Sequence, residues 1–484
     1  MKYYIGVDIG STSTKGVLMD RDRNIIRKDS RLHELTIIDG ISETWAESFF
    51  KESMDIIGNL IQKGNIFPGD IESITFSGFE SVSFIGKGGI EVHPTITYLD
   101  SRSEAIAHEF TKLIDPKELF IKTKNRASSI FEGYKAMYAL RNIKAPLNQI
   151  KLLDVAHYCV FRLTGKYVMD HTSAMLFAPF YNVSKSDWDH EMLELANLNP
   201  DILPTLMESY EIAGTVNGDS SDKFNLSRDT LVTAGAQDAY ASLLADGVLD
   251  KGESSFIYAT SGVYDVVHDG TKFDSIFANT RHIIPGRYVS EAAMYNAGSL
   301  LNWFGKIIRK NLSKMDTIIE KRNRPGKIIS LPFFTGERAP IWNNKLKGSF
   351  YYVDFSNDIY DFYLSLMEGV GYWLKYTIEK FNSIDVFPKS IVAGGGGSKS
   401  TIWTQIVSDI VGLPQEIKVS EGAAQGDGFI SLYSSGEINS FNEIRDLIKT
   451  RKNVTPNTKL KGPYEKQFNQ FKKLLEISLS EIYN

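Results

Sequence analysis

The stretch YYIGVDIGSTSTKG, residues 3–16, sets the first expectation about the fold. β-favouring residues lead to Asp8, and a turn rich in Gly, Ser and Thr follows before apolar residues resume after Lys15. We expect two strands joined by a polar turn. Backbone N–H groups and hydroxyls in such a turn can surround phosphate oxygens, and a carboxylate at the strand end suits phosphate-bound magnesium. A solvated hairpin turn is the alternative interpretation.

Length and composition narrow the class of protein. The chain has 484 residues, 42% apolar and 23% charged, with a formal net charge of −5, which disfavours nucleic acid as a partner. Cys159 is the only cysteine, so we expect no internal disulfide and no thiolate zinc site, and a reducing cytoplasm fits. Because we find neither a signal-peptide pattern nor about 18 uninterrupted apolar residues, we expect neither secretion nor a membrane span.

The order of strand and helix signals predicts two α/β halves. Strand-like runs alternate with a helical pattern over residues 45–62, residues 100–199 are mainly helical, and long amphipathic patterns cover 299–313 and 358–382. SSFIYATSGVYDVVHDG, residues 254–270, repeats the opening theme of a β-rich run, a hydroxyl-rich turn and a second β-rich run. We expect two domains, residues 1–246 and 247–484, each a mixed sheet flanked by helices, with a cleft between them.

AGGGGSKS, residues 393–400, is a second candidate for nucleotide binding. Four successive glycines let a ligand approach the backbone, and residues 401–412 form an amphipathic helix pattern whose N-terminus could receive a nucleotide. A flexible linker is the alternative. Neither glycine-rich stretch has P-loop spacing, and no Gly-x-Gly-x-x-Gly run opens a helix after the first strand, which disfavours both common nucleotide folds.

Asp238 and the segment near residue 100 are the candidates for handling an acceptor alcohol. Asp238 lies among small and apolar residues, where it is either a helix cap or the general base that phosphoryl transfer to a hydroxyl requires. YLDSRS, residues 98–103, carries Asp100 and Arg102, and Glu80 precedes it by about twenty residues. Carboxylates accept hydrogen bonds from the hydroxyls of a polyol, although charged loop residues are usually only solvated.

The ordered set of motifs resembles the FGGY family of carbohydrate kinases, which belongs to the actin/hexokinase/heat-shock ATPase superfamily. Besides the stretches quoted above, the matching motifs are AGAQDAY, AGSLLNWF, LPFFTGERAP with LKGSF, MEGVGYWL and EGAAQGDGFISL. The resemblance covers nearly the whole chain. It implies two domains of ribonuclease H-like (actin-like ATPase) topology and transfer of the γ-phosphate of ATP, with Mg2+, to a sugar or polyol hydroxyl.

The resemblance also implies roles for individual residues. Asp238 matches the catalytic base, Asp8 and Asp238 match carboxylates near magnesium, and Glu80, Asp100, Arg102 and Asp238 fall in substrate-facing segments. The residues matching nucleotide contacts are Gly10, Ser11, Thr12, Ser13, Lys15, Thr260, Ser261, Gly262, Gly298, Asn302, Gly395, Gly396, Lys399 and Ser400. Family members are often dimers or tetramers, so a homodimer is one arrangement the resemblance allows.

Departures from the family pattern leave the substrate open. Ala259 stands before Thr260 where the second turn usually has glycine. Xylulose-kinase-like members carry Gln-Met-His where this chain has GFESVSF, and Ser81 takes the place of the histidine. Glycerol-kinase-like members carry Arg-Glu-Thr, matched only by Glu80, since Phe79 replaces the arginine. Whole-chain similarity favours a ketopentose such as xylulose. Alternatives are a polyol or sugar-acid kinase (glycerol, erythritol, gluconate), a non-enzymatic superfamily ATPase, and a catalytically inactive sugar sensor.

Overall fold

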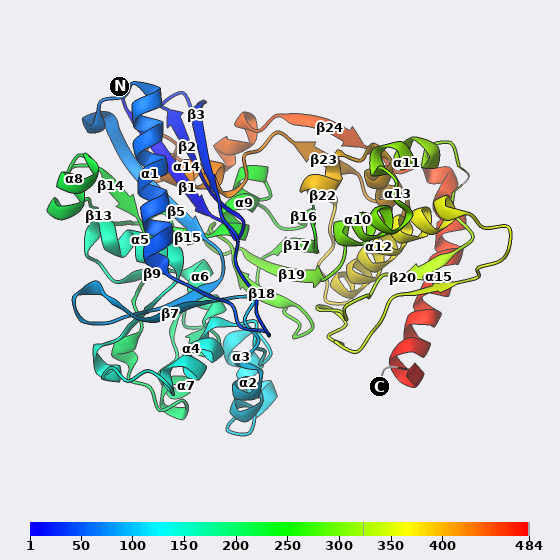
Figure 1. Ribbon diagram of the computed structural model, residues 1–484, viewed down its shortest axis with the longest axis horizontal. Coiled ribbons are helices and arrows are strands. Elements are labelled where there is room, and N and C mark those ends of the chain that lie inside the picture. The colour runs from blue at the N-terminus through cyan, green and yellow to red at the C-terminus, as the bar shows by residue number, and fades with distance from the viewer. Residues whose placement is uncertain (323, 483–484) are drawn as a thin grey trace. The chain divides into compact units, whose positions relative to one another are not determined.

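The computed structural model describes residues 1–322 and 324–482, which form two compact units. Unit 1 comprises Met1–Leu249, Thr280–Gly286 and Ser420–Ile448, and unit 2 comprises Asp250–Asn279, Arg287–Val419 and Lys449–Asn484. Each unit contains a mixed sheet flanked by helices, as expected (Figure 1). No helix within the described residues is both long and apolar enough to cross a membrane.

The main sheet of unit 1 has the order β13-β14-β5-β1-β2-β3, and β15 also pairs with β5. β1, β2 and β3 are antiparallel, whereas β5 runs parallel to β1 and β14 runs parallel to β5. The strands are β1 (Tyr3–Ile9), β2 (Ser13–Asp20), β3 (Ile25–Leu32), β5 (Ile71–Gly78), β13 (Ile212–Thr215), β14 (Leu231–Thr233) and β15 (Ala236–Gln237).

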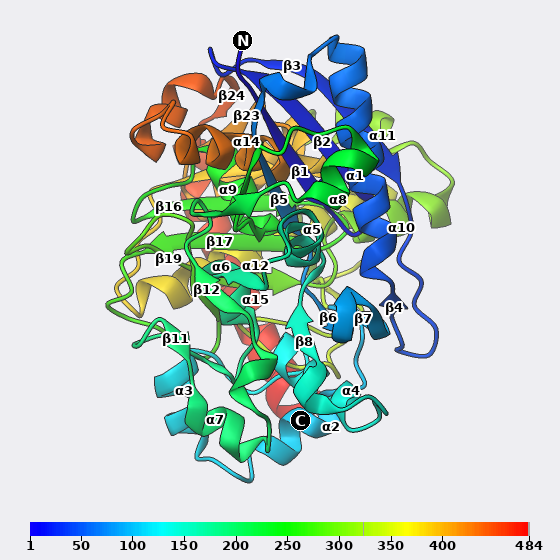
Figure 2. The ribbon, with the colours of Figure 1, turned by 90° about the vertical axis from the view of Figure 1, so that its left-hand side faces the viewer.

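Helices cover both faces of this sheet (Figure 2). α1 (Ala46–Gly64) and α5 (Val155–Thr164) lie on one face. They pack closely on the strands there, since a Cβ at Gly16 would meet Ile56 of α1 and a Cβ at Gly78 would meet Val155 of α5. On the other face α14 (Ala423–Ser434) packs so closely on β1 that a Cβ at Gly6 would overlap the backbone of α14, and α9 (Asp238–Asp246) packs on α14. The α14 segment thus joins unit 1 although it follows most of unit 2 in sequence.

Smaller elements complete unit 1. A four-stranded sheet of order β4-β7-β6-β8 contains β4 (Glu43–Thr44), β6 (Ser81–Ile85), β7 (Glu91–Thr97) and β8 (Lys151–Leu153). Two two-stranded sheets pair β9 (Val168–Asp170) with β12 (Thr205–Met207), and β10 (Tyr181–Asn182) with β11 (Asp187–Trp188). The other helices are α2 (Glu104–Phe110), α3 (Pro116–Thr123), α4 (Glu132–Leu140), α6 (His171–Leu176), α7 (His190–Leu195) and α8 (Gly218–Phe224).

Unit 2 repeats the strand order and directions of unit 1. Its sheet runs β18-β19-β17-β16-β22-β23-β24, with β19, β17 and β16 antiparallel, β22 and β23 parallel to β16, and β24 antiparallel to β23. The strands are β16 (Glu253–Tyr258), β17 (Gly262–His268), β18 (Ala278–Arg281), β19 (Tyr288–Met294), β22 (Ser390–Gly394), β23 (Gln415–Lys418) and β24 (Thr450–Val454). Of β18, only residues 278–279 belong to unit 2. Each hydroxyl-rich turn therefore joins the first two strands, in sequence order, of its own main sheet: β1 to β2 in unit 1 and β16 to β17 in unit 2.

The helices of unit 2 bury its large aromatic core. Phe256 of β16 lies beside Trp373, with ring centroids 6.3 Å apart, and Tyr258 of β16 lies beside Trp403, with ring centroids 5.0 Å apart. The helices are α10 (Gly298–Ile308), α11 (Leu312–Ile319), α12 (Ile359–Asn382), α13 (Thr401–Val411) and α15 (Lys461–Ile477), and β20 (Ile329–Leu331) pairs with β21 (Ser349–Tyr351). α10 and α12 correspond to the patterns at 299–313 and 358–382, but α10 ends five residues earlier because Arg309 adopts a left-handed backbone conformation with φ of 52°.

Candidate active site

The turn predicted over residues 10–15 is shorter in the structure, because β1 ends at Ile9 and β2 already begins at Ser13, which places Lys15 in β2. The Gly10 N–H donates to the Ser13 carbonyl at 3.1 Å. The His33 ring lies 2.8 Å from the Gly10 carbonyl through Nε2 and 3.0 Å from the Glu52 carboxylate through Nδ1. Sequence reasoning missed His33 and Glu52, because nothing in residues 33–52 shows that this segment returns to the turn.

Asp8 lies next to the end of β1 with Lys15 opposite it on β2 and Ser77 opposite it on β5. Its side chain is buried, and Oδ1 accepts no hydrogen bond from any residue that the structure describes. Burial raises the pKa of Asp8 to about 6, and the charges of Lys15 and His33 counteract part of that rise. A buried carboxyl oxygen without a hydrogen-bond partner among the described residues therefore stands at the base of the turn.

Strand register brings Glu80 and Asp238 to the same edge of the sheet. Ile9, Gly78 and Gln237 form one row across β1, β5 and β15, and the chain continues from these positions to Gly10, Glu80 and Asp238. Burial, and then the carboxylates of Asp8 and Glu80, raise the pKa of Asp238 well above its ordinary value. Two carboxyl groups up to 230 residues away in sequence thus act on Asp238.

Asp238 is not the cap of α9. The N-cap is Gln237, whose Oε1 accepts from the Ala239 N–H at 2.8 Å and whose amide donates to Asp238 Oδ1 at 2.6 Å. The capping alternative is therefore wrong for Asp238, which is the first helical residue. Gln237 instead orients the Asp238 carboxylate.

Asp427 of α14 is a further carboxyl group that the sequence did not single out. It is fully buried beneath β5, where its Oδ2 accepts from Ser77 Oγ at 2.7 Å and its Oδ1 has no partner within the described residues. Burial raises its pKa well above the ordinary value, and Asp8 and Asp238 raise it further. The only signal in the sequence is an acid within the glycine-rich run QGDG, which by itself predicts no position in space.

Asp100 and Arg102 are brought together as a bidentate ion pair. The Arg102 Nε lies 3.0 Å from both carboxylate oxygens of Asp100, and its terminal nitrogen lies 2.7 Å from Oδ2. Arg102 also donates to Glu43 Oε1 at 2.5 Å and lies 5.0 Å above the Tyr138 ring. The segment adjoins Glu80, since the Tyr98 N–H donates to the Glu80 carbonyl at 3.0 Å.

In unit 2, the second turn borders a cavity of about 590 Å³. Six of the predicted nucleotide contacts line this cavity: Thr260, Gly298, Asn302, Gly396, Lys399 and Ser400. The other three predicted contacts that lie in unit 2, Ser261, Gly262 and Gly395, are neighbours of these residues in sequence. Gly395 has a φ of 77°, and a Cβ at this position would overlap the backbone of Tyr258. Glycine therefore lets the chain run this close to Tyr258.

The glycine run is not a flexible linker. It leaves β22, forms a single 3-10 turn over Gly396–Lys399, and enters α13 with Ser400 as its N-cap. Ser400 Oγ accepts from the Trp403 N–H at 3.2 Å and donates to Asp316 at 2.7 Å, and Tyr363 donates to the other Asp316 oxygen at 2.8 Å. Asp316, which the sequence reasoning missed, fixes this end of the cavity.

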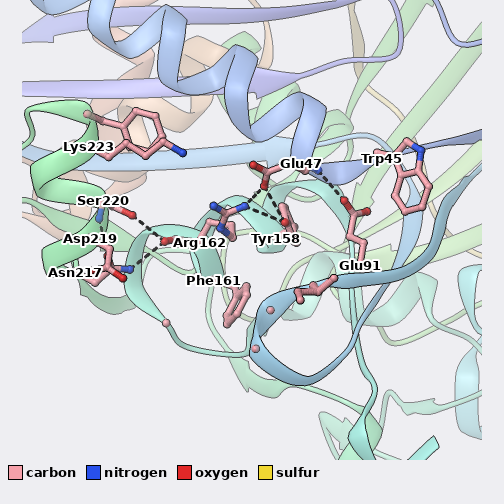
Figure 3. Close-up of a pocket in the computed structure, with 15 residues that line it drawn as sticks. Trp45, Glu47, Glu91, Tyr158, Phe161, Arg162, Asn217, Asp219, Ser220 and Lys223 are labelled. Atoms are coloured by element: carbon pink, nitrogen blue, oxygen red, sulfur yellow. Dashed lines mark hydrogen bonds and ion pairs between the residues drawn. The ribbon is translucent and has the colours of Figure 1, made fainter. Parts of the chain in front are cut away.

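Unit 1 contains a different cavity of about 620 Å³, the α5–α8 cavity, which none of the predicted site residues lines (Figure 3). Its ionic groups contact one another: Arg162 forms an ion pair with Glu47, and the Tyr158 hydroxyl donates to Glu47 Oε2 at 3.0 Å. Glu91 accepts the N–H groups of Ala46 and Glu47 at 2.9 and 3.0 Å. The lining comprises Trp45, Glu47, Gly88, Gly89, Ile90, Glu91, Tyr158, Phe161, Arg162, Gly165, Asn217, Asp219, Ser220, Lys223 and Phe224.

Comparison with known proteins identifies the class as carbohydrate kinase, a type of phosphotransferase. Residues 3–245 match the N-terminal domain of the FGGY family of carbohydrate kinases, and residues 253–429 match its C-terminal domain. The chain belongs to the FGGY family of carbohydrate kinases. This confirms the family resemblance drawn from the sequence motifs.

Relatives with different named substrates cover almost the whole chain. The gluconokinase of Bacillus subtilis (strain 168) is 27% identical over 478 residues, covering 94% of this chain and 92% of the relative. The xylulose kinase of Lactococcus lactis subsp. lactis (strain IL1403) is 26% identical over 501 residues, covering 100% and 98%.

Solved structures confirm the fold. The xylulose kinase from Rhodospirillum rubrum superimposes with a TM-score of 0.92 at 22% identity, covering 99% of each chain. The gluconate kinase from Lactobacillus acidophilus gives 0.91 at 24% identity, covering 100% of this chain and 99% of the other. Both neighbours have the actin-like ATPase fold that the sequence motifs implied.

Proposed function

We propose that this chain transfers the γ-phosphoryl group of ATP to a hydroxyl of a sugar or polyol, with Asp238 as the general base. The observation that carries the proposal is the row formed by Ile9, Gly78 and Gln237, which gathers Asp8, Glu80 and Asp238 at one sheet edge beside the first turn. A base must reach the attacking hydroxyl near the transferred phosphate, and family membership supplies the reaction class.

Asp238 is suited to accept the hydroxyl proton because its raised pKa makes its carboxylate a stronger base than an exposed aspartate. The Gln237 amide donates to Oδ1 and so orients the carboxylate. In the turn, Gly10, Ser11, Thr12, Ser13 and Lys15 would bind phosphate oxygens in the proposed complex. The residues lining the 590 Å³ cavity of unit 2 would hold the nucleotide.

The carboxylates present fit a magnesium ion bound through phosphate and water. Magnesium in kinase sites takes one or two carboxylates and otherwise water and phosphate oxygens. Asp8 offers a buried oxygen without a partner, and Asp238 lies close enough for the two charges to interact. No group of three or more acidic, His or Cys side chains in the described residues could hold a metal alone. When bound, the ion would neutralise charge on the transferred phosphoryl group.

The first test is coupled ADP release with ATP and Mg2+ against xylulose, ribulose, rhamnulose, fuculose, glycerol, erythritol and gluconate. We expect one acceptor to stimulate ADP release well above the sugar-free rate, which also separates a kinase from a superfamily ATPase acting on protein partners. The order of sequence motifs favours a ketopentose such as xylulose, and the named relatives include both xylulose kinases and gluconokinases. ATP binding without stimulation by any acceptor would argue instead for a sugar sensor.

A further inference from the structure

Glu132, the first residue of α4, is a buried carboxyl group without a partner. Its side chain is 1% exposed, and neither carboxyl oxygen accepts a hydrogen bond from another described residue. Buried polar groups in folded proteins are nearly always hydrogen-bonded, because an unsatisfied one is costly. The charge of Lys135 acts on Glu132, but no described residue donates a hydrogen bond to its carboxyl oxygens, which points to a ligand that supplies the missing donors.

Glu132 belongs to the same acidic group as the proposed base. Burial and then the charge of Glu80 raise the pKa of Glu132, and Glu80 also acts on Asp238. The connection is structural, because α4 packs against β6, the strand that Glu80 immediately precedes. The charge of Glu80 thus acts both on Glu132 and on Asp238, which groups the three carboxyl groups around Glu80.

The cations of this region already have partners. Arg102 is bound by Asp100 and Glu43, and its guanidinium stacks on Tyr138 of α4. Lys135, the cation of α4, is fully buried and donates to the Ser129 carbonyl. An acceptor bearing its own carboxylate would therefore lose its hydration here without gaining a cation as partner, which is costly for a charged group.

Resting on the proposed kinase function, we infer that the acceptor is an uncharged polyol or ketose whose hydroxyls donate to Glu132 and Glu80, and that sugar acids are excluded. A hydroxyl provides the hydrogen-bond donor that the carboxyl oxygens of Glu132 lack, whereas a carboxylate provides none. A site that accepts a hydrogen bond from its substrate strongly rejects analogues that lack the hydrogen-bond donor. The inference selects between the two classes of named relatives, xylulose kinases and gluconokinases.

Acceptors matched in carbon skeleton test this directly. D-xylulose, xylitol and D-xylonate form one set, and D-fructose, D-glucitol and D-gluconate form another, each measured by thermal shift and by coupled ADP release. We expect a neutral member to raise the melting temperature and to be phosphorylated, with kcat/KM at least about a hundredfold above that of its acid. If the kcat/KM of an acid were within tenfold of that of the best neutral acceptor, or if neither class bound, the inference would be overturned. A neutral acceptor that binds without being phosphorylated would contradict the proposed function but leave this inference standing.

Glu132→Gln assigns the effect to this residue, with the exposed Glu118→Gln on α3 as the matched control. We expect the KM for the neutral acceptor to rise about tenfold or more, the KM for ATP to stay within twofold, and the preference over the sugar acid to shrink. Unchanged acceptor KM and preference would remove Glu132 from the site. If Glu132→Gln does not fold, Glu132→Asp and the wild-type acceptor comparison still decide the question.

Discussion

Unit 1 contains two sets of acidic side chains, and they differ in whether their oxygens have partners. In the α5–α8 cavity, Glu47 and Glu91 receive hydrogen bonds or ion pairs from Arg162, Tyr158 and the backbone of α1. At the sheet edge, by contrast, Asp8 keeps a buried oxygen to which no described residue donates a hydrogen bond.

The difference separates a structural role from a functional one. A carboxylate whose hydrogen bonds are made within the protein stabilises the folded chain. A buried carboxylate without hydrogen-bond partners lowers stability and is retained where a ligand uses it. We therefore do not expect the α5–α8 cavity to be the acceptor site. The comparison predicts that substitutions in the α5–α8 cavity change stability, and that substitutions at the acidic edge change catalysis.

The largest expected effect is that of Asp238→Asn. The amide keeps the size and the bond to Gln237 but cannot accept the hydroxyl proton, so kcat should fall by about 10²–10⁴-fold. Nucleotide affinity and melting temperature should not decrease, because the substitution removes a buried charge. Steady-state kinetics and ATP titration check this, with the exposed Asp229→Asn as control. Near-normal turnover would show that another group is the base.

Glu47→Gln should have the second largest effect, on stability alone. It breaks the partly buried ion pair with Arg162, and we expect a loss of about 1–3 kcal/mol in the free energy of unfolding. Urea unfolding of the single variants and of the double variant with Arg162→Met isolates the pair energy. Since no predicted site residue lines this cavity, kcat should stay within twofold. A large loss of turnover without loss of stability would break the comparison.

The sequence predicted the strand-turn-strand units and the residues near them because both depend on local patterns. Asp8 with its turn, and the glycine run that caps α13, follow from alternation, turn residues and helix periodicity. The division at Asp246 and the catalytic, metal and nucleotide roles of individual residues stay predictions.

Partners that meet only through the tertiary fold could not be predicted in this way. Ser77 and Asp427 are 350 residues apart, and only the return of α14 to unit 1 joins them. Glu132 looks like an ordinary first-turn acid of a helix until its burial is known. Long-range strand register, absent from any local pattern, decides which acids meet.

Asp427→Asn should raise stability, opposite in sign to Glu47→Gln. Because the folded-state pKa of Asp427 is raised, its contribution is fully present below its ordinary pKa near 4 and is lost as pH rises through the raised value. The asparagine side chain still accepts the hydrogen bond from Ser77. It does not ionise, so it loses no stability as pH rises. We expect a gain of about 1 kcal/mol near pH 8 that disappears near pH 4, measured by urea unfolding at both pH values. A pH-independent difference would mean that Asp427 titrates normally in the folded chain.

Glu91→Gln gives the smallest effect and the finest test of the comparison. Trp45, the N-cap of α1, provides no side-chain cap, and Glu91 of β7 instead accepts the first two helical N–H groups. The amide can accept only one of these bonds well and removes the negative charge from the positive end of the helix dipole. The expected cost is about 0.5–1 kcal/mol, with unchanged kinetics. Glu72→Gln, which removes only a surface ion pair with Lys2, should cost less. If Glu91→Gln instead altered the acceptor KM, satisfied carboxylates could not be assigned to stability alone, and the distinction between the two acidic sets would fail.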